Sequence, residues 1–294
     1  MSHSHHNVGI GVKLAAGGFA GVTEILVMYP LDVVKTRAQL YAGTGKNPSI
    51  IGTVSEIVKT NGLKSLYRGI LPPILMEAPK RAVKFAANEF FKDIFMEKDT
   101  KKLSQVGAAL SGSCAGITEA FVVVPFELVK IRLQAKENLG LYKNTQDAIT
   151  KILKQEGVLT LYTGLEATIW RNATWNGGYF GLIHAVKSRM PATNSEGQRL
   201  FQDFIAGFLS GTFGTMLNTP FDVVKTRIQN QLPGTVHKYN WTLPALAKVY
   251  NEEGVKALYK GFWPKVLRLG PGGGILLVVF NFAVRFMSPQ PQHH

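Results

Sequence analysis

The sequence predicts an all-α membrane protein with six transmembrane helices in three pseudo-symmetric repeats, each carrying one short helix at the membrane surface. Two observations predict this fold class: a phrase that recurs at a constant interval, and apolar runs of membrane-spanning length that contain Gly and Pro. The phrase reads YPLDVVKTRAQ, VPFELVKIRLQ and TPFDVVKTRIQ, at residues 29–39, 124–134 and 219–229. Its prolines, Pro30, Pro125 and Pro220, are 95 residues apart both times, which predicts three units of about one hundred residues.

A second motif repeats in the same register. NGLKSLYRG, EGVLTLYTG and EGVKALYKG occupy residues 61–69, 156–164 and 253–261. Two motifs that keep one register through the chain indicate that every repeat has the same internal order of elements. We therefore divide the chain into three repeats that form one integrated domain, at residues 1–100, 101–197 and 198–294.

Each repeat begins with a long apolar stretch that ends in the recurring phrase. These stretches run from Leu14 to about Leu40, from 104 to 136 and from 200 to 230. At about 1.5 Å per residue, each is long enough to cross a hydrocarbon core of about 30 Å with some tilt. The second long helix of each repeat follows the second motif, at residues 70–96, 165–189 and 262–287.

A loop and a short amphipathic segment lie between the two long helices of each repeat. The segments are SIIGTVSEIVKT, TQDAITKILKQ and LPALAKVYNE, at residues 49–60, 145–155 and 243–252. Each is too short and too polar to span a bilayer. We therefore expect all three to lie along the membrane surface.

A soluble protein made of three helical repeats would explain the periodicity equally well. It would not explain why Gly and Pro lie inside the longest apolar runs, where they weaken a soluble helix by about 1 and 3 kcal/mol. In a membrane both are tolerated, because small residues let helices approach closely and neighbouring helices satisfy the freed carbonyl groups. A hydrophobic content of 46% and a mean hydropathy of +0.06 suit helices that are apolar on one face only.

Charge and residue types narrow the partners. Lys and Arg outnumber Asp and Glu by 33 to 19, which favours acidic lipid, small anions or nucleic acid. Nucleic acid is the weakest of these, because the chain has no basic tract interleaved with aromatics and no zinc-finger spacing. Cys114 is the single cysteine, so no disulfide joins parts of the chain. We expect no metal site at the histidines of the two ends, His3, His5, His6, His293 and His294.

Charged residues follow each recurring proline at constant positions. An acid stands two residues after the proline and a lysine five residues after it: Asp32 and Lys35, Glu127 and Lys130, Asp222 and Lys225. One interpretation is a pair within a single helix, worth roughly a few tenths of a kcal/mol. The other is that a proline kink turns three helix ends toward a common axis, so that each acid reaches the lysine of the next repeat. The resulting ring of three ion pairs would close one end of a cavity, braced by the glutamine nine residues after each proline: Gln39, Gln134 and Gln229.

The triplicated P-x-[DE]-x-x-[KR]-x-[KR] motif, with the second motif written [DE]-G-x-x-x-x-aromatic-[KR]-G, resembles the mitochondrial carrier family across essentially the whole chain. Asn61 and Thr163 depart from it, in place of an acid in repeat one and a base in repeat two. The resemblance implies a multi-pass antiporter of the mitochondrial inner membrane that alternates between a cavity open to the cytosol and one open to the matrix, with the proline-linked ring as its matrix gate. The short N-terminus has neither a secretory nor an amphipathic leader, so we expect no cleaved presequence.

The family has a second gate on the cytosolic side, built from an aromatic-[DE]-x-x-[KR] motif on the second long helix of each repeat. In this chain only Glu89 and Lys92 keep both charges of the motif, and Asn88 replaces the aromatic residue. One pair in place of three predicts a weak cytosolic gate. It also predicts a conformation open to the cytosol when no substrate is bound.

The resemblance also implies where the substrate binds. Seven residues after the last glycine of the second motif lie Met76, Arg171 and Arg268, which match the family's substrate contacts. An arginine at membrane depth is costly unless it faces water or a partner, so Arg171 and Arg268 are binding candidates, with structural pairing to buried acids as the alternative. Their planar guanidinium groups suit bidentate binding of carboxylates. Neighbouring polar and aromatic residues complete the candidate site: Glu77, Lys80, Arg81, Lys84, Asn172 and Trp175.

The excess of positive charge at these positions predicts an anion with about two negative charges. The pair Arg171-Asn172 resembles the family's carriers of keto and carboxylic acids, and GILPPILMEAPKRAVKF and LRLGPGGGILL are similar to its oxodicarboxylate carriers. The resemblance implies one-for-one exchange of 2-oxoadipate and 2-oxoglutarate. Malate or citrate is the alternative within the family, and a proton or anion leak, or a scaffold without exchange, is the alternative outside it.

Membrane lipid is a further expected partner. Gly69, Gly164 and Gly261 open the second long helices, whose N-terminal amides can hold phosphate, a geometry that in the family resembles cardiolipin sites. Three repeats complete one pathway, so a monomer suffices. We expect no cofactor and no enzymatic activity, because the sequence shows no nucleophile with a base, no metal constellation and no phosphate-binding loop.

Overall fold

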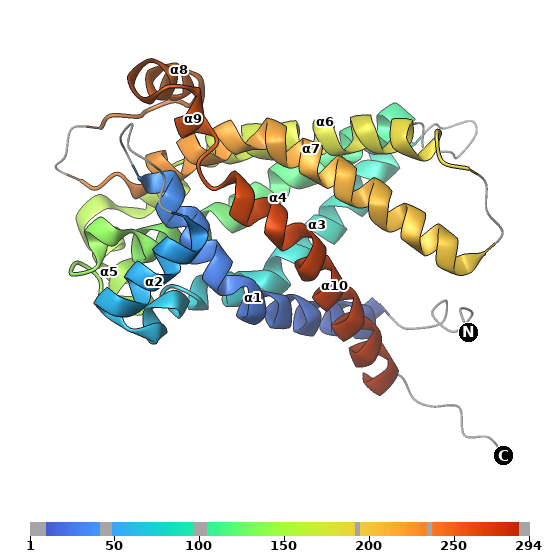
Figure 1. The fold of residues 1–294 in the computed structure, drawn as a ribbon, viewed down its shortest axis with the longest axis horizontal. Coiled ribbons are helices and arrows are strands. Elements are labelled where there is room, and N and C mark those ends of the chain that lie inside the picture. Colours follow the sequence, from blue (N-terminus) through green and yellow to red (C-terminus); the bar gives the residue numbers. More distant parts are fainter. Residues whose placement is uncertain (1–9, 42–48, 97–104, 192–194, 234–236, 288–294) are drawn as a thin grey trace.

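The computed structural model describes residues 10–41, 49–96, 105–191, 195–233 and 237–287, so the terminal histidines lie outside it. The described residues form an all-helical bundle (Figure 1). Its six long helices are α1 (Ile10–Leu40), α3 (Leu71–Phe95), α4 (Gln105–Gln134), α6 (Leu165–Lys187), α7 (Glu196–Asn230) and α10 (Phe262–Met287). The ranges expected from the sequence agree with these bounds to within a few residues.

A short helix connects the two long helices of each repeat. These connecting helices are α2 (Ile50–Asn61), α5 (Thr145–Glu156) and α8 (Thr242–Glu253), and the short turns after them are Leu63–Tyr67, Val158–Tyr162 and α9 (Val255–Leu258); a further turn, Lys136–Asn138, follows α4. Ser49 and Asn144 cap α2 and α5 by accepting hydrogen bonds from backbone N–H groups of the first turn. All three helices end at the first glycine of the second motif: Gly62, Gly157 and Gly254. These glycines have a positive φ of 78° to 84°, which only glycine adopts readily.

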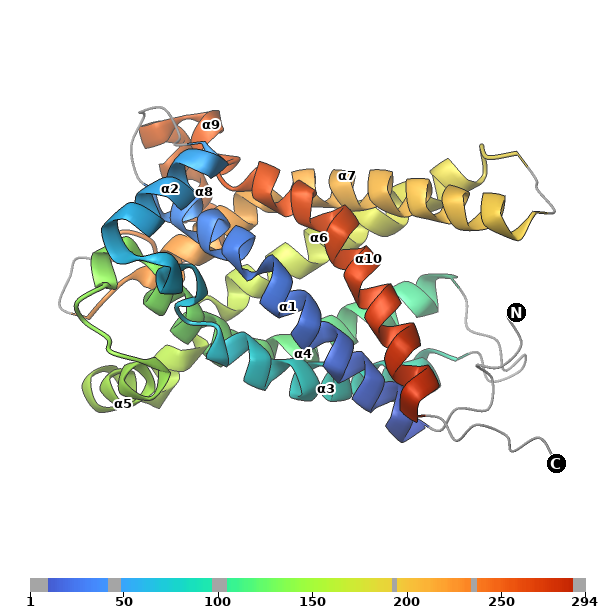
Figure 2. The same cartoon turned by 60° about the horizontal axis from the view of Figure 1, so that its bottom comes forward.

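The long helices lie side by side in a closed arrangement. The second long helix of each repeat packs against the first of the next, which pairs α3 with α4, α6 with α7 and α10 with α1. Figures 1 and 2 show α2, α5 and α8 gathered at one end, whereas α1 begins and α10 ends at the opposite end. The recurring phrase of each repeat therefore lies at the end of the bundle that carries the short helices.

Apolarity differs among the long helices. Two stretches, Leu14–Leu40 and Val255–Met287, are long and apolar enough to cross a membrane by length and composition. Among the described residues, no such stretch lies in the other four long helices, although the shortest of them, α6 with 23 residues, is about 34 Å long.

Small apolar cores fix the short helices to the bundle. Ile57 of α2 packs with Tyr29 and Val33 of α1, and the other two repeats have equivalent clusters. Elsewhere, large apolar side chains such as Phe286 and Phe282 are well exposed on the outer surface of α10. Exposure of that kind suits helices that face lipid.

Two buried ion pairs add to these cores. Arg132 and Arg227, which carry the second base of the recurring phrase, each contact the glutamate that ends the next short helix, Glu156 and Glu253. All four side chains are less than 8% exposed. Arg37 is the corresponding residue of repeat one, and among the described residues it has no such partner, because Asn61 stands where the acid would be.

Candidate functional site

The proline-linked charges meet in a ring. Each acid pairs with the lysine of the following repeat: Asp32 with Lys130 (2.8 Å), Glu127 with Lys225, and Asp222 with Lys35 (2.7 Å). These side chains are 3% to 24% exposed. The pairs therefore join different helices, as in the second of the two interpretations of the sequence, and the pairing within one helix is not observed.

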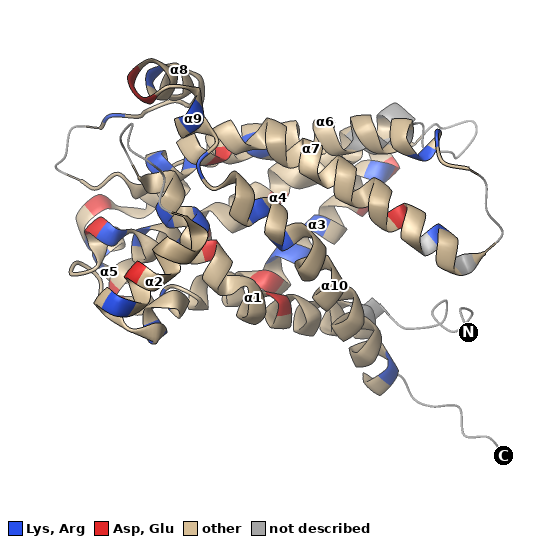
Figure 3. Cartoon of the chain, in the orientation of Figure 1, with Lys and Arg blue, Asp and Glu red and all other residues tan. Residues whose placement is uncertain are grey.

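The local sequence explains why the helices can reach one another. Pro30, Pro125 and Pro220 lie inside continuous helices, where a proline removes one backbone hydrogen bond and bends the helix. Figure 1 shows α1 changing direction along its length before it reaches the short helices. Figure 3 shows acids and bases crowded at this end of the bundle.

The three glutamines do not share the role expected of them. Gln39 donates to the Asp222 carboxylate (3.0 Å), so it braces an ion pair. Gln134 instead donates to the hydroxyl of Tyr29 (2.9 Å), and Gln229 to the backbone carbonyl of Thr163 (3.2 Å). The prediction that each glutamine braces a pair is therefore wrong in two repeats.

Packing against a glycine accounts for two of the three glutamines, Gln39 and Gln229. A Cβ atom at Gly261 would lie 3.0 Å from Cγ of Gln39, and one at Gly164 would lie 2.8 Å from Cγ of Gln229. Each of these glutamines thus fills the space left by the last glycine of the second motif in a neighbouring repeat. Gly69 faces Leu133 in the same way, with 3.0 Å between the added Cβ and Cβ of Leu133. The phospholipid contact expected at these three glycines stays a prediction.

Both candidate substrate arginines are tied to the ring. Arg268 donates to Asp32 (2.6 Å) and to Glu24 (2.8 Å). Arg171 donates to Glu127 (3.1 Å) and lies 3.8 Å from a carboxylate oxygen of Asp222. The two arginines come from different repeats, and between them they contact all three ring acids. The pairing with acids that the sequence left as an alternative is thus present, but the acids belong to the ring.

The third candidate position lies among the charges of α3. Met76 is buried, and the adjacent Glu77 pairs with Lys80 (2.7 Å) and Arg81 (2.6 Å). Glu77 lies so close to α1 that a Cβ atom at Gly21 would be 2.2 Å from its Oε1. Both cations therefore share one acid, which packs against the neighbouring helix, and the group of three keeps one net positive charge.

Lys84 and Lys80 separate in the structure. Lys80 stays on its own helix with Glu77, whereas Lys84 reaches Glu119 of α4 (3.2 Å) with 61% of its side chain exposed. Asn172 accepts a hydrogen bond from Arg171 (3.0 Å), which orients that guanidinium group. The two lysines thus contact different acids, and Glu119 was not recognised in the sequence.

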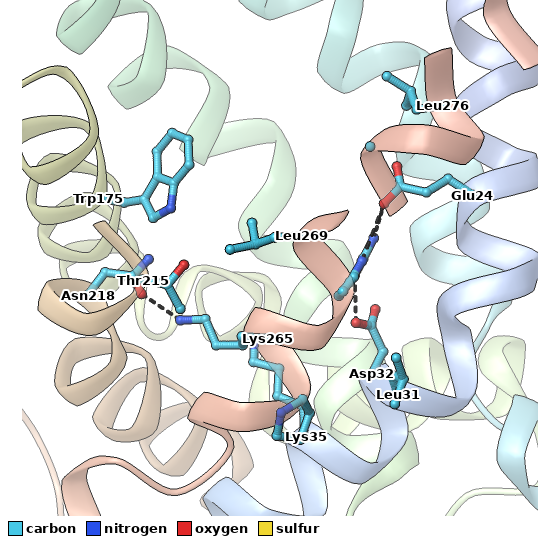
Figure 4. Close-up of a pocket in the computed structure, with 13 residues that line it drawn as sticks. Glu24, Leu31, Asp32, Lys35, Trp175, Thr215, Asn218, Lys265, Leu269 and Leu276 are labelled. Atoms are coloured by element: carbon cyan, nitrogen blue, oxygen red, sulfur yellow. Dashed lines mark hydrogen bonds and ion pairs between the residues drawn. The ribbon is translucent and has the colours of Figure 1, made fainter. Parts of the chain in front are cut away.

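A cavity of about 380 Å³ adjoins the ring. Figure 4 shows it between α1, α7 and α10, with Trp175 on one side and Glu24 and Asp32 on the other. Arg268 and Trp175 are the candidate substrate residues in its wall, whereas Arg171, Asn172 and the charged group of α3 do not line it. Only some of the candidate substrate residues therefore line this cavity.

Two charged residues of the cavity wall were missed in the sequence. Lys265 contacts Asn218 (2.5 Å) and Asp222 (3.3 Å), and Glu24 contacts Arg268. Lys265 precedes Arg268 by one helical turn, and Glu24 is an acid inside the apolar run of α1. An ionisable residue in such a run is a signal of function that could have identified Glu24.

The predicted pair at the other end does not join two repeats. Glu89 and Lys92 contact each other within α3 (2.7 Å), and their side chains are 52% and 37% exposed. At this spacing they are neighbours on one helix surface, so the pair forms without a partner helix. Lys187 of α6 contacts Asp203 of α7 (2.7 Å), a link between repeats that the sequence did not suggest.

Comparison with known proteins agrees with this architecture. A family model described as mitochondrial carrier protein matches residues 6–99, 101–194 and 196–291. A "Probable mitochondrial 2-oxodicarboxylate carrier" of Dictyostelium discoideum is 59% identical over 94% of this chain and 91% of its own length. "Mitochondrial citrate transporter D" of Aspergillus niger is 54% identical over 94% of each chain. "Mitochondrial 2-oxodicarboxylate carrier 2" of Saccharomyces cerevisiae is 50% identical over 96% of this chain and 95% of its own.

Three matched repeats cover nearly the whole chain, and the relatives align along almost their full length. The helices, the order of the motifs and the ring of ion pairs follow the same three-fold division. The chain therefore belongs to the mitochondrial carrier family, whose members are transporters and not enzymes.

Proposed function

We propose that the protein is an antiporter of the mitochondrial inner membrane that exchanges 2-oxodicarboxylates, namely 2-oxoadipate and 2-oxoglutarate, by alternating access. The observation that carries the proposal is the contact of Arg171 and Arg268 with the three ring acids. A ligand with two carboxylates that binds both arginines competes with these acids. Binding of the substrate and opening of the ring are then one event.

The energies involved are of a suitable size for such a switch. An ion pair at about 4 Å has roughly 4 kcal/mol of attraction at an effective dielectric near 20, much of it offset by desolvation. Drawing an arginine away removes one of the contacts that stabilise a ring acid. Asp32 would keep Lys130 and lose Arg268, so the ring weakens without losing every partner.

The charge balance supports a diacid. Glu77 offsets one of the two positive charges of Lys80 and Arg81, and Lys84 has Glu119. Arg171 and Arg268 remain as the guanidinium groups that contact the ring acids, and each suits one carboxylate. We assign Asn172 and Trp175 to contacts with the keto group or with the carbon chain of the substrate. The names of the relatives from Dictyostelium and yeast support the same class of substrate.

A tricarboxylate is the second candidate. The relative from Aspergillus niger is named a citrate transporter, and it is 54% identical to this chain. A trianion would need a further cation, and Lys265 of the cavity wall could supply it. Its ion pair with Asp222 (3.3 Å) is longer than the ion pairs of the ring, so this lysine is held less closely by its acid. Exchange assays with both classes of anion separate the two candidates.

The test is exchange in liposomes that contain the purified protein. Uptake of radiolabelled 2-oxoglutarate is measured after preloading with 2-oxoadipate, malate, citrate, ADP or buffer. We expect uptake with internal 2-oxoadipate and none with buffer, and a loss of about 10- to 100-fold in Arg171→Ala and in Arg268→Ala, the equivalent of roughly 1.5–3 kcal/mol for a hydrogen bond to a charged group. Lys238→Ala, which removes an exposed ion pair with Glu252, is the control and should keep wild-type uptake.

Other results would change the proposal in defined ways. Uptake driven by citrate or malate in preference to 2-oxoadipate would move the substrate within the carboxylates. Uptake into liposomes without an internal anion would indicate a leak in place of exchange. No uptake of any anion would contradict the transport proposal and favour a scaffold.

A further inference from the structure

Glu24 is an acid in the middle of an apolar helix. It lies two turns before Asp32 in α1, and its side chain is 19% exposed. Its Oε1 atom accepts hydrogen bonds from Nη2 of Arg268 (2.8 Å) and from Nε of the same residue (3.3 Å). Figure 4 shows Glu24 and Asp32 along one side of the cavity, and Arg268 contacts both of them. A side chain of this chain thus holds Arg268 where a substrate carboxylate would bind.

The neighbouring helix is shaped to admit this carboxylate. A Cβ atom at Gly272 of α10 would lie 3.1 Å from Oε1 of Glu24 and 3.5 Å from Cγ of Arg268. An added Cβ at Gly270, Gly273 or Gly274 would have nothing within 4 Å. Of these four glycines, Gly272 is therefore the one whose missing side chain makes room for the Glu24 carboxylate.

We propose that Glu24 is a built-in competitor for the substrate carboxylate and that it sets the charge of the anion that the site accepts. This inference rests on the proposed function, because it assumes that Arg268 binds substrate. The charged residues in the cavity wall are Lys35, Lys265 and Arg268 against Glu24 and Asp32, which leaves one net positive charge. Replacing Glu24 with a neutral residue leaves two.

Two consequences follow, and they can be measured separately. Substrate must displace Glu24 from Arg268, so the carboxylate of Glu24 weakens the binding of every anion. Its negative charge also repels an anion of three charges more strongly than an anion of two, so it favours dicarboxylates over tricarboxylates. Competition depends on where the carboxylate lies, whereas charge selection depends only on its presence.

Glu24→Gln removes both effects. We expect its half-saturation concentration for 2-oxoglutarate to fall about tenfold and its ratio of citrate to 2-oxoglutarate uptake to rise about tenfold. Arg268 keeps Asp32 as a partner, so the variant does not leave the guanidinium group without an acid. Glu24→Asp keeps the charge and should retain the wild-type uptake ratio.

Gly272→Ala separates competition from charge. The added methyl group presses on Oε1 of Glu24 without removing its charge. We expect the half-saturation concentration for 2-oxoglutarate to fall by about threefold with an unchanged uptake ratio. Gly274→Ala is the matched control for an alanine in this helix, and it should change neither quantity because nothing lies near the added atom.

The outcomes discriminate among three explanations. A higher half-saturation concentration in Glu24→Gln, or a lower maximal rate alone with an unchanged ratio, would show that Glu24 only holds the helices together and would overturn the inference. If wild-type protein exchanges no carboxylate, the proposed function fails. In that case the inference is tested by the rise in unfolding temperature that 2-oxoglutarate or citrate causes. Glu24→Gln should enlarge the rise with citrate more than the rise with 2-oxoglutarate.

Discussion

Repeats one and three differ in how the second base of the recurring phrase connects the long helices to the short one. In repeat three, Arg227 contacts Glu253 through both nitrogens of its guanidinium end and donates to the backbone carbonyls of Gln39 and Tyr41. One side chain thereby joins α7, α8 and the end of α1. Arg132 makes the equivalent contacts with Glu156 and with the carbonyls of Gln229 and Gln231.

Repeat one lacks this connection. Nε of Arg37 is buried without a hydrogen-bond partner among the described residues. Other contacts hold the seam between repeats one and two: Arg68 donates to the carbonyls of Leu139 (2.9 Å) and Tyr142 (2.5 Å), and Lys136 pairs with Glu56 (2.6 Å). The ring of ion pairs is thus nearly three-fold symmetric, whereas the layer beneath it is not. We infer that the seam between repeats one and two separates most easily when the ring opens.

The largest effect is expected from breaking the connection in repeat three. Glu253→Gln removes the charge that Arg227 contacts, and both side chains are 6% exposed or less. Breaking a buried pair leaves an uncompensated charge, so we expect a loss of about 3 kcal/mol in the free energy of unfolding. The measurement is thermal unfolding in detergent, with Glu252→Gln as the matched control.

Glu252 is the neighbouring residue on α8, and its pair with Lys238 is 40% to 44% exposed. Its replacement should cost less than about 0.5 kcal/mol, as is usual for exposed pairs. Equal losses in the two variants would contradict the assignment of the Arg227 connection as the stabilising one.

A smaller effect is expected from building the missing connection in repeat one. Asn61→Glu places a carboxylate at the repeat position that Glu156 and Glu253 occupy, as a partner for Arg37, whose Nε is buried without a hydrogen bond among the described residues. We expect a gain of about 1 kcal/mol in stability, and slower exchange because one more pair must break when the ring opens. Arg37→Ala in the same chain should abolish both changes. A gain that survives this second substitution would show that Arg37 is not the partner.

The smallest effect is expected from the exposed ion pair between Lys136 and Glu56, at the seam where repeat one lacks the buried pair. The hydrogen bond from Lys136 lowers the pKa of Glu56 below its usual value. A depressed carboxyl pKa gives stability that is present above the unfolded pKa and is lost as the pH falls through the folded pKa. We expect the unfolding temperature of the wild type to fall slightly more than that of Glu56→Gln as the pH drops below about 4.5, and high salt to reduce the difference. Parallel curves for the two proteins would show that the pair adds nothing.

The repeats and their helices were readable from the sequence because they depend on local pattern. Pro30, Pro125 and Pro220 fixed the period, and the glycines of the second motif fixed where the short helices end. The ring followed from three-fold symmetry, since identical positions in three repeats must lie around one axis. Asn61 was recognised as a departure from the pattern, and its consequence for Arg37 is visible in the structure.

The partners of single side chains were not readable in this way. Gln134 recurs in register with Gln39, yet it contacts Tyr29, a residue whose counterparts are Val124 and Thr219. Glu89 and Lys92 fit a motif that closes a gate, but nearness on one helix was enough to pair them. Such contacts depend on distances of a few ångströms between helices, and a repeat motif does not contain that information.

The sequence by itself determined the family, the three-fold helical frame and the side chains that form the ring, because each rests on residue type at a fixed interval. Only the tertiary structure showed that Arg171 and Arg268 contact the ring acids and that Glu24 accompanies Arg268. The reason is physical: strong attraction between charges acts over a few ångströms, and residues 24 and 268 come within that range only after the last helix has packed against the first.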